Sequence, residues 1–153
     1  MTKVAIMLGG NLPGTRDAMD EAIKSFAANG LMITAQSSVY ASEAVDCVPG
    51  TPDFLDMAIA GDWQKSAEEL LSLGQILERA AGRPALHSSR ESRILDCDII
   101  LFGDMEINSV NLTIPHPRAR QRRFVMEPLA EIIPEWVFPG TGGKCVAELY
   151  KEL

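Results

Sequence analysis

The sequence predicts an α+β sandwich in which a mainly antiparallel sheet is flanked by helices. Apolar and polar residues alternate in segments that short turns separate, which is the pattern of paired antiparallel strands. Other segments carry apolar residues at the helical spacing, and these lie between and after the strands. This order of strands and helices favours an antiparallel sheet over a parallel doubly wound one.

Length and composition predict one globular domain over residues 1–153. A chain of 153 residues buries enough surface to fold without metals or disulfides. Hydrophobic residues make up 46% and charged residues 23%, a balance that is typical of a folded protein and excludes a disordered or collagen-like one.

Charge and cysteine content indicate the compartment and the kind of partner. The net charge of −7 opposes contact with a phosphate backbone, so we expect no nucleic-acid partner. Cys47, Cys97 and Cys145 are widely spaced and predict neither a disulfide framework nor a zinc ribbon. The apolar run over residues 4–8 is too short for a signal peptide or a membrane span. We expect a cytoplasmic protein without a membrane partner, present as a monomer or a weak dimer.

The first part of the chain predicts a strand, a helix and a second strand. Residues 3–8 are predicted to form a buried strand, which the glycine- and proline-containing segment of residues 9–14 is expected to end. Apolar residues then recur at the helical spacing from Met19 to Phe26, and Asn29-Gly30 supplies a left-handed stop. Residues 31–40 alternate with period two and predict the second strand.

A turn-rich loop over residues 41–53 leads into a third strand that begins near Phe54. We expect this strand to pair antiparallel with the second one. Ser66 and Glu69 have the spacing of a capping box, and the helix that they start is predicted to run to Gly82.

The remaining elements surround one strongly apolar strand over residues 94–102. The polar loop before it, residues 83–93, has the length of a lid or binding segment. Gly103-Asp104 is predicted to turn the strand into a short partner around residues 105–107. Helices are predicted near residues 128–132 and over roughly 145–153.

Asp96 and Asp98 interrupt the apolar strand at alternate positions. Alternate residues of a strand point the same way and lie about 7 Å apart, so both carboxylates could reach a shared divalent ion. Two buried carboxylates without cations would cost several kcal/mol. The pair therefore indicates either a metal site or an edge strand whose face is solvated.

A second group of polar residues follows the strand. His116 lies between two prolines that fix the backbone on either side of it. Arginines crowd the stretch just beyond, at positions 118, 120, 122 and 123. Guanidinium groups suit phosphate oxygens, yet a turn histidine and surface charge would have the same pattern. Gly9-Gly10-Asn11 lacks the lysine of a phosphate-binding loop and is interpreted as a structural turn.

Four segments together resemble the 6-hydroxymethyl-7,8-dihydropterin pyrophosphokinase family. They occur in the family's order, near its spacing, across almost the whole chain. The most specific are the R-x-L-D-x-D-I-x-L-F-G pattern of residues 93–103 and the P-H-P of residues 115–117. The four segments are residues 8–12; 37–40 with 52–55; 93–103; and 113–117 with Arg122, Phe124-Val125 and Pro128-Leu129.

The resemblance implies a ferredoxin-like α+β fold and an activity in folate biosynthesis. The β,γ-pyrophosphoryl group of ATP would pass to 6-hydroxymethyl-7,8-dihydropterin, with release of AMP. Asp96 and Asp98 would bind two Mg²⁺ ions that bridge the triphosphate. Family positions that contact phosphate are Arg83, Arg93, His116 and Arg122, and those near the nucleotide are Gln75, Glu78 and Thr113. Family positions around the pterin are Phe54 and Phe124 on its two faces, with Asp56 and the backbone from Ser42 to Val45 at its polar edge.

The chain departs from the family pattern near the expected pterin. Asp56 stands where the family usually has an asparagine. An amide both donates and accepts hydrogen bonds, whereas a carboxylate only accepts them. Arg90-Glu91-Ser92-Arg93 replaces the common Trp-Gly-Pro-Arg, so the loop lacks its aromatic residue. Both changes bear on substrate affinity and on the choice of substrate.

Two other functions remain open from the sequence. A divergent paralogue would bind nucleotide or a pterin-like ligand without the standard reaction, and an assay of AMP release would distinguish it. A small interaction module with a solvated Asp pair would show no Mg²⁺-dependent shift in melting temperature with an ATP analogue.

Overall fold

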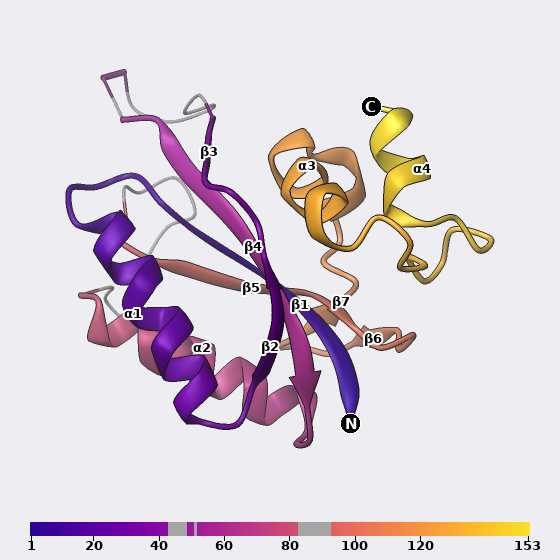
Figure 1. Ribbon diagram of the computed structural model, residues 1–153, viewed down its shortest axis with the longest axis horizontal. Coiled ribbons are helices and arrows are strands. Elements are labelled where there is room, and N and C mark those ends of the chain that lie inside the picture. The colour runs from indigo at the N-terminus through magenta and orange to yellow at the C-terminus, as the bar shows by residue number, and fades with distance from the viewer. Residues whose placement is uncertain (43–48, 51, 83–92) are drawn as a thin grey trace.

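The computed structural model describes residues 1–42, 49–50, 52–82 and 93–153, and its centre is an antiparallel sheet (Figure 1). The sheet has five strands, and four of them follow the order β2-β4-β1-β5, while β3 pairs with the start of β4. The strands are β1 (Thr2–Gly10), β2 (Met32–Gln36), β3 (Tyr40–Ser42), β4 (Phe54–Trp63) and β5 (Asp96–Phe102). A separate small sheet holds β6 (Ile107–Asn108) and β7 (Thr113–Ile114).

Helices cover both faces of the sheet. The helices α1 (Thr15–Ala28) and α2 (Ala67–Ala80) lie on one face, and α3 (Arg123–Ile132) and α4 (Val146–Lys151) lie on the other (Figure 1). Alternate residues of β1 separate the two cores, because Val4, Ile6 and Leu8 pack toward α1 and α2 while Ala5 and Met7 pack toward α3 and α4. The predicted α+β sandwich is confirmed, and the element order β1-α1-β2-β3-β4-α2-β5 is ferredoxin-like when β2 and β3 are taken as one interrupted strand. Within the described part of the chain, no helix is long and apolar enough to cross a membrane.

Strand β1 continues through Gly9 and ends at Gly10, so it runs two residues beyond its predicted end at residue 8. These glycines serve a close approach of backbones. A Cβ atom on Gly10 would lie 2.1 Å from the backbone oxygen of Ile94 and 2.7 Å from Oγ1 of Thr15. A residue with a side chain could not occupy this point of the strand without moving its neighbours.

The segment predicted as one strand over residues 31–40 consists of two strands, β2 and β3, and a break at residues 37–39 separates them. Both pair antiparallel with β4, as predicted. Ser37 explains the break, because its backbone N–H donates to the oxygen of Ala58 (2.9 Å) and its Oγ accepts from the N–H of Ala58 (2.8 Å). A side-chain oxygen thus replaces a backbone oxygen in the ladder, and the chain turns away from the sheet.

Other boundaries differ from the predictions in ways that local sequence does not reveal. The turn at Gly103-Asp104 forms, but the next strand, β6, pairs with β7 instead of β5. Helix α3 begins at Arg123 and contains Pro128, which the sequence had suggested as its start. Proline lacks an N–H and usually marks a first turn, so packing of the helix against the sheet has overridden local preference. Helix α4 is shorter than predicted and ends at Lys151.

The capping box at the start of α2 is confirmed. The N–H of Glu69 donates to Oγ of Ser66 at 3.1 Å, and the N–H of Ser66 donates to Oε1 of Glu69 at 3.3 Å. These reciprocal bonds satisfy N–H groups that the first helical turn leaves without partners.

Candidate active site

Three strands bring two carboxylates into one row across the sheet. In β1, Gly9 pairs with Asp56 of β4 on one side and with Asp96 of β5 on the other. Residues paired directly across strands point to the same face, here the face that α3 and α4 cover. The strands are about 4.8 Å apart, so the backbones of Asp56 and Asp96 are roughly 10 Å apart. Gly9 leaves the space between them open, since a Cβ there would come within 2.9 Å of Oδ1 of Asp56.

Asp96 and Asp98 lie on the same face of β5, as the alternation predicted. Asp98 pairs with Met7, whose side chain belongs to the core beneath α3 and α4. Cys97, between the two aspartates, packs toward α2, and its N–H donates to Oε2 of Glu78 at 2.8 Å. Both aspartates are half-buried, so their carboxylates remain within reach of a ligand.

The donor set suits a hard divalent cation. Carboxylate oxygens are the ligands that Mg²⁺ prefers, and protein sites often supply only one or two of them. Among residues 1–42, 49–50, 52–82 and 93–153, no group of three or more histidine, cysteine, aspartate or glutamate side chains could enclose a metal. Mg²⁺ held by Asp96 and Asp98 would therefore complete its coordination with phosphate oxygens and water.

Arg93 lies beside the aspartate pair and an aromatic ring. Its Nη1 is 4.0 Å from Oδ2 of Asp96, and its guanidinium carbon is 5.3 Å from the centre of the Phe54 ring. The side chain is only 13% exposed, so its charge is little screened by water. A cation, a carboxylate and an aromatic face thus meet at the ends of β4 and β5.

Asn11, which the sequence had assigned to a simple turn, holds this arrangement. It is buried, and its backbone N–H donates to the oxygen of Arg93 while its Oδ1 accepts from the N–H of Arg93, each at 2.8 Å. Its Nδ2 donates to the oxygen of Pro52 at 3.2 Å. One side chain therefore fixes the segments that precede Phe54 and Asp96. The signal in the sequence was a polar residue at the end of a fully buried strand.

Burial and neighbouring charges change the titration of Asp56. Burial raises its pKa from 3.8 to about 6, and the charge of Asp96 adds to the increase. A hydrogen bond from Oγ of Ser42 (3.0 Å) and the charge of Arg93 act in the opposite direction. At neutral pH most of the Asp56 carboxylate is ionised, because the pH then lies above its pKa of about 6. It accepts a proton more readily than a surface aspartate does.

His116 lies near both Arg122 and Asp96, since the charges of both act on its ring. The pKa of His116 is lowered by burial and then by the positive charge of Arg122, with Asp96 partly opposing the change. Its ring is therefore neutral at pH 7. Nδ1 is buried and has no hydrogen-bond partner among the described residues. Arg122 caps α3, and its guanidinium carbon is 5.6 Å from the centre of the Phe124 ring, which is 40% exposed.

The remaining expected residues are not all part of this group. Gln75 is exposed on α2, the helix that covers the opposite face of the sheet, although Glu78 of the same helix reaches the backbone of β5. Thr113 is half-buried in β7, where it pairs with Asn108. Arg83 and Val45 lie outside the described residues.

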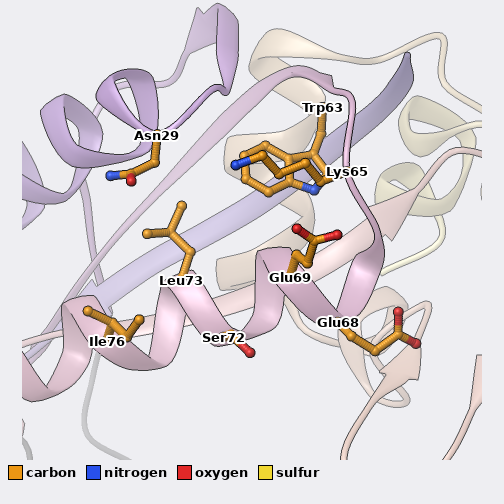
Figure 2. A pocket seen from close by; sticks show the side chains of 8 residues that line it. All are labelled: Asn29, Trp63, Lys65, Glu68, Glu69, Ser72, Leu73 and Ile76. Carbon is orange, nitrogen blue, oxygen red and sulfur yellow. The ribbon is translucent and has the colours of Figure 1, made fainter.

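A hollow of about 320 Å³ lies away from these residues, beside α2 (Figure 2). Its lining includes Trp63, across which Lys65 lies. The indole N–H of Trp63 donates to the oxygen of Ser66, the residue that caps α2, and Nδ2 of Asn29 donates within the end of α1. Its lining comes from Asn29 after α1, from the end of β4 and from α2, so the hollow is separate from the aspartate row.

The fold and the site together define a class of protein. A ferredoxin-like domain places an aspartate pair beside convergent cationic and aromatic side chains, an arrangement suited to a transferase that handles phosphate groups. The chain belongs to the 7,8-dihydro-6-hydroxymethylpterin-pyrophosphokinase family, whose model matches residues 5–134. The predicted family is confirmed.

Individual relatives agree with this family. A Synechocystis protein named 2-amino-4-hydroxy-6-hydroxymethyldihydropteridine pyrophosphokinase is 36% identical over 147 residues, which cover 95% of this chain and 73% of the relative. A Methylorubrum extorquens protein of the same name is 30% identical over 157 residues, covering 100% of this chain and 94% of the relative. The crystal structure of Plasmodium falciparum HPPK-DHPS with pteroate has a TM-score of 0.73 at 14% identity, covering 99% of this chain but only 42% of that one. That likeness shows the fold.

Proposed function

We propose that this chain transfers the pyrophosphoryl group of ATP to 6-hydroxymethyl-7,8-dihydropterin, in the biosynthesis of folate. The observation that carries the proposal is the row of Asp56, Gly9 and Asp96 beside Asp98, faced by Arg93 and His116. The names of the relatives point to the same reaction. The hydroxymethyl oxygen would form a bond to the β-phosphorus of ATP and lose its proton. The bond from that phosphorus to the α,β-bridging oxygen would break, and AMP would leave with that oxygen.

Asp96 and Asp98 would hold two Mg²⁺ ions against the triphosphate. When bound, these ions neutralise charge that develops on the phosphate oxygens. The residues of the chain supply the rest of the neutralisation. Arg93 presents a poorly hydrated guanidinium next to Asp96, and Arg122 presents another from the start of α3. Arg83 would add a third cation.

His116 would act as a neutral hydrogen-bond donor to phosphate. Its lowered pKa keeps one ring nitrogen protonated and the other free of a proton at pH 7. A neutral donor directs a phosphate oxygen without adding a charge that the metal ions and arginines already supply. Gln75, Glu78 and Thr113 would contact the nucleotide, since the family resemblance places them there.

The pterin would lie between Phe54 and Phe124. Phe54 points to the same face as Asp56, two residues further along β4, and Phe124, in the first turn of α3, is 40% exposed and would be free to cover the other face of the ring. Ser42 donates a hydrogen bond to Asp56 at 3.0 Å. These two side chains, together with the backbone at Val45, would contact the polar edge of the pterin ring. We further propose that the chain works in the cytoplasm as a monomer or weak dimer.

The experiment that tests the function measures AMP in the presence of each substrate alone and of both together. We expect AMP only when ATP, Mg²⁺ and the dihydropterin are all present, in an amount equal to the pyrophosphorylated pterin formed. ADP in place of AMP, or AMP formed without the pterin, would refute the proposed reaction.

A further inference from the structure

We propose that Glu131 is a positioning residue that sets the spacing between the two sides of the pterin site, an inference that rests on the proposed function. Its carboxylate ties the end of α3 to Ser38, just before β3, and to Tyr40, the first residue of β3. Oε2 and Oε1 accept from the N–H of Ser38 at 3.0 and 3.1 Å, Oε2 also accepts from Oγ of Ser38 at 3.2 Å, and Oε1 accepts from the hydroxyl of Tyr40 at 2.5 Å. Three donors from one short segment thus converge on one carboxylate.

The break between β2 and β3 creates the need for this tie. Ser37 occupies the ladder position beside Ala58 with its own side chain, so the N–H of Ser38 points away from β4. An N–H that leaves a ladder bonds either to water or to another acceptor of the chain. Glu131, from a helix more than ninety residues later in the chain, supplies it.

On the sheet side, the hydrogen bonds of Glu131 hold β3, and β3 pairs with residues of β4 that we propose contact the pterin. Tyr40 pairs with Asp56 and Ser42 pairs with Phe54. The hydroxyl of Ser42 donates to Asp56 at 3.0 Å. A shift of β3 along or away from β4 would therefore move the acceptor group and the aromatic ring of the same wall.

On the helix side, Glu131 shares a face of α3 with Phe124. The two residues are seven positions apart, which is close to two helical turns and places them about 10 Å apart along one side. Glu131 therefore fixes, relative to β3, the side of α3 that carries Phe124. The distance also means that Glu131 does not itself contact a ring stacked on Phe124.

The bonds keep the tie in one protonation state. The hydroxyl of Tyr40, and then the donors of Ser38, lower the pKa of Glu131, and Glu131 raises the pKa of Tyr40 to about 12. The other titratable groups that act on Tyr40 are Glu127 and Tyr150, and their effects are smaller. The carboxylate stays ionised and the phenol stays protonated across the working range of pH.

Glu127 offers a matched control, because it lies one turn earlier on α3 and also accepts from a tyrosine. Its partners are Tyr150 of α4 and Arg123 of α3, and β3 is not among them. Removing Glu127 loosens the surface of the same helix without touching the tie to β3.

The test compares Glu131→Ala, Glu131→Gln, Tyr40→Phe and Glu127→Ala with the wild type, using the Kd of the dihydropterin and the KM of ATP. We expect Glu131→Ala to weaken pterin binding about tenfold, since a small misplacement of binding groups is costly, and to change the KM of ATP less than twofold. Glu131→Gln keeps one acceptor oxygen, so its loss of pterin affinity should be about half that of Glu131→Ala on a logarithmic scale. Adding Tyr40→Phe to Glu131→Ala should weaken binding no further, because both changes break one tie.

Several results would overturn the inference. These are wild-type pterin affinity in Glu131→Ala, equal losses for both substrates, or an equal loss in Glu127→Ala. If Glu131→Ala does not fold, Glu131→Gln and Tyr40→Phe decide by the same criteria. A wild-type chain that neither binds the pterin nor forms AMP would refute the proposed function instead. The tie is then judged by amide exchange at residues 40–42, which should quicken in Glu131→Ala and not in Glu127→Ala.

Discussion

Asp56 differs from a surface aspartate in two respects. It is buried, and it stands two strands away from a second carboxylate on the same face. Ser42 and Arg93 offset part of the cost of its charge, yet its pKa remains raised to about 6. A side chain with this pKa exchanges its proton within the range in which enzymes work.

The raised pKa predicts how stability depends on pH in the absence of ligands. Between pH 4 and 6 the unfolded chain has already lost the proton of Asp56, whereas the folded chain still holds it. The free energy of unfolding should therefore fall as pH rises through this window, by up to about 3 kcal/mol from this group, and then level off. Denaturant titrations of wild type and Asp56→Asn should show this decrease only in the wild type; parallel curves would contradict the assignment.

The same titration should govern pterin binding. An ionised Asp56 can accept charge-assisted hydrogen bonds from the N–H groups of the pterin, so wild-type affinity should rise between pH 5 and pH 8. At pH 8, Asp56→Asn should bind about 1–2 kcal/mol more weakly and show no such rise. Tighter binding by the variant would mean that the carboxylate faces an acceptor of the ring, and identical affinities would mean that the side chain does not touch it.

Arg93 contacts both Asp96 and the Phe54 ring, so its role needs a kinetic separation. If it acts on the triphosphate, Arg93→Ala should lower kcat by at least about 10²-fold and change the Kd of the pterin far less. Steady-state kinetics with each substrate varied in turn measures the difference. Loss of pterin affinity with unchanged handling of ATP would place Arg93 at the pterin instead. Arg120→Ala, an exposed arginine of the same chain, is the control and should behave as wild type.

At the scale of elements, the sequence predicted the features that depend on residues close together in the chain. The alternation that placed Asp96 and Asp98 on one face and the capping box of Ser66 are both present in the structure. The row of Asp56, Gly9 and Asp96 was beyond prediction, because it depends on the register of three strands far apart in the chain. The glycines of β1 were misjudged for the same reason, since the atoms that require them belong to another segment.

Gly10 tests the close packing at the end of β1. In Gly10→Ala the new Cβ meets a backbone oxygen at 2.1 Å, so the variant should lose about 1–3 kcal/mol of unfolding free energy, or more. Gly74→Ala is the control, because its Cβ would be in ordinary contact with Cβ of Cys97 at 3.4 Å and alanine favours a helix interior by roughly 0.5–1 kcal/mol. Chemical denaturation measures both, and an unaffected Gly10→Ala would mean that the approach of residue 94 is looser than described.

At the scale of the whole molecule, an acidic chain gathers positive charge at one place. The net charge is −7, yet Nη1 of Arg93 lies 4.0 Å from Oδ2 of Asp96, and the charge of Arg122 acts on the same histidine, His116, as that of Asp96. The resulting field favours an anionic substrate that arrives with cations. The fold itself tolerates wide change, since it persists in a structure only 14% identical to this chain. Under the proposed function, the chemistry would depend on the residues at this end of the sheet.

The most direct measurement of the central claim is the rate of AMP formation in Asp96→Ala and Asp98→Ala at saturating Mg²⁺. Because each carboxylate would hold metal against the triphosphate, we expect either change to lower the rate by roughly 10³-fold or more while the melting temperature without ligands stays near that of wild type. Asp104→Ala, which removes an exposed carboxylate just after β5, should leave the rate unchanged. A rate near that of wild type in Asp96→Ala or Asp98→Ala would contradict the account.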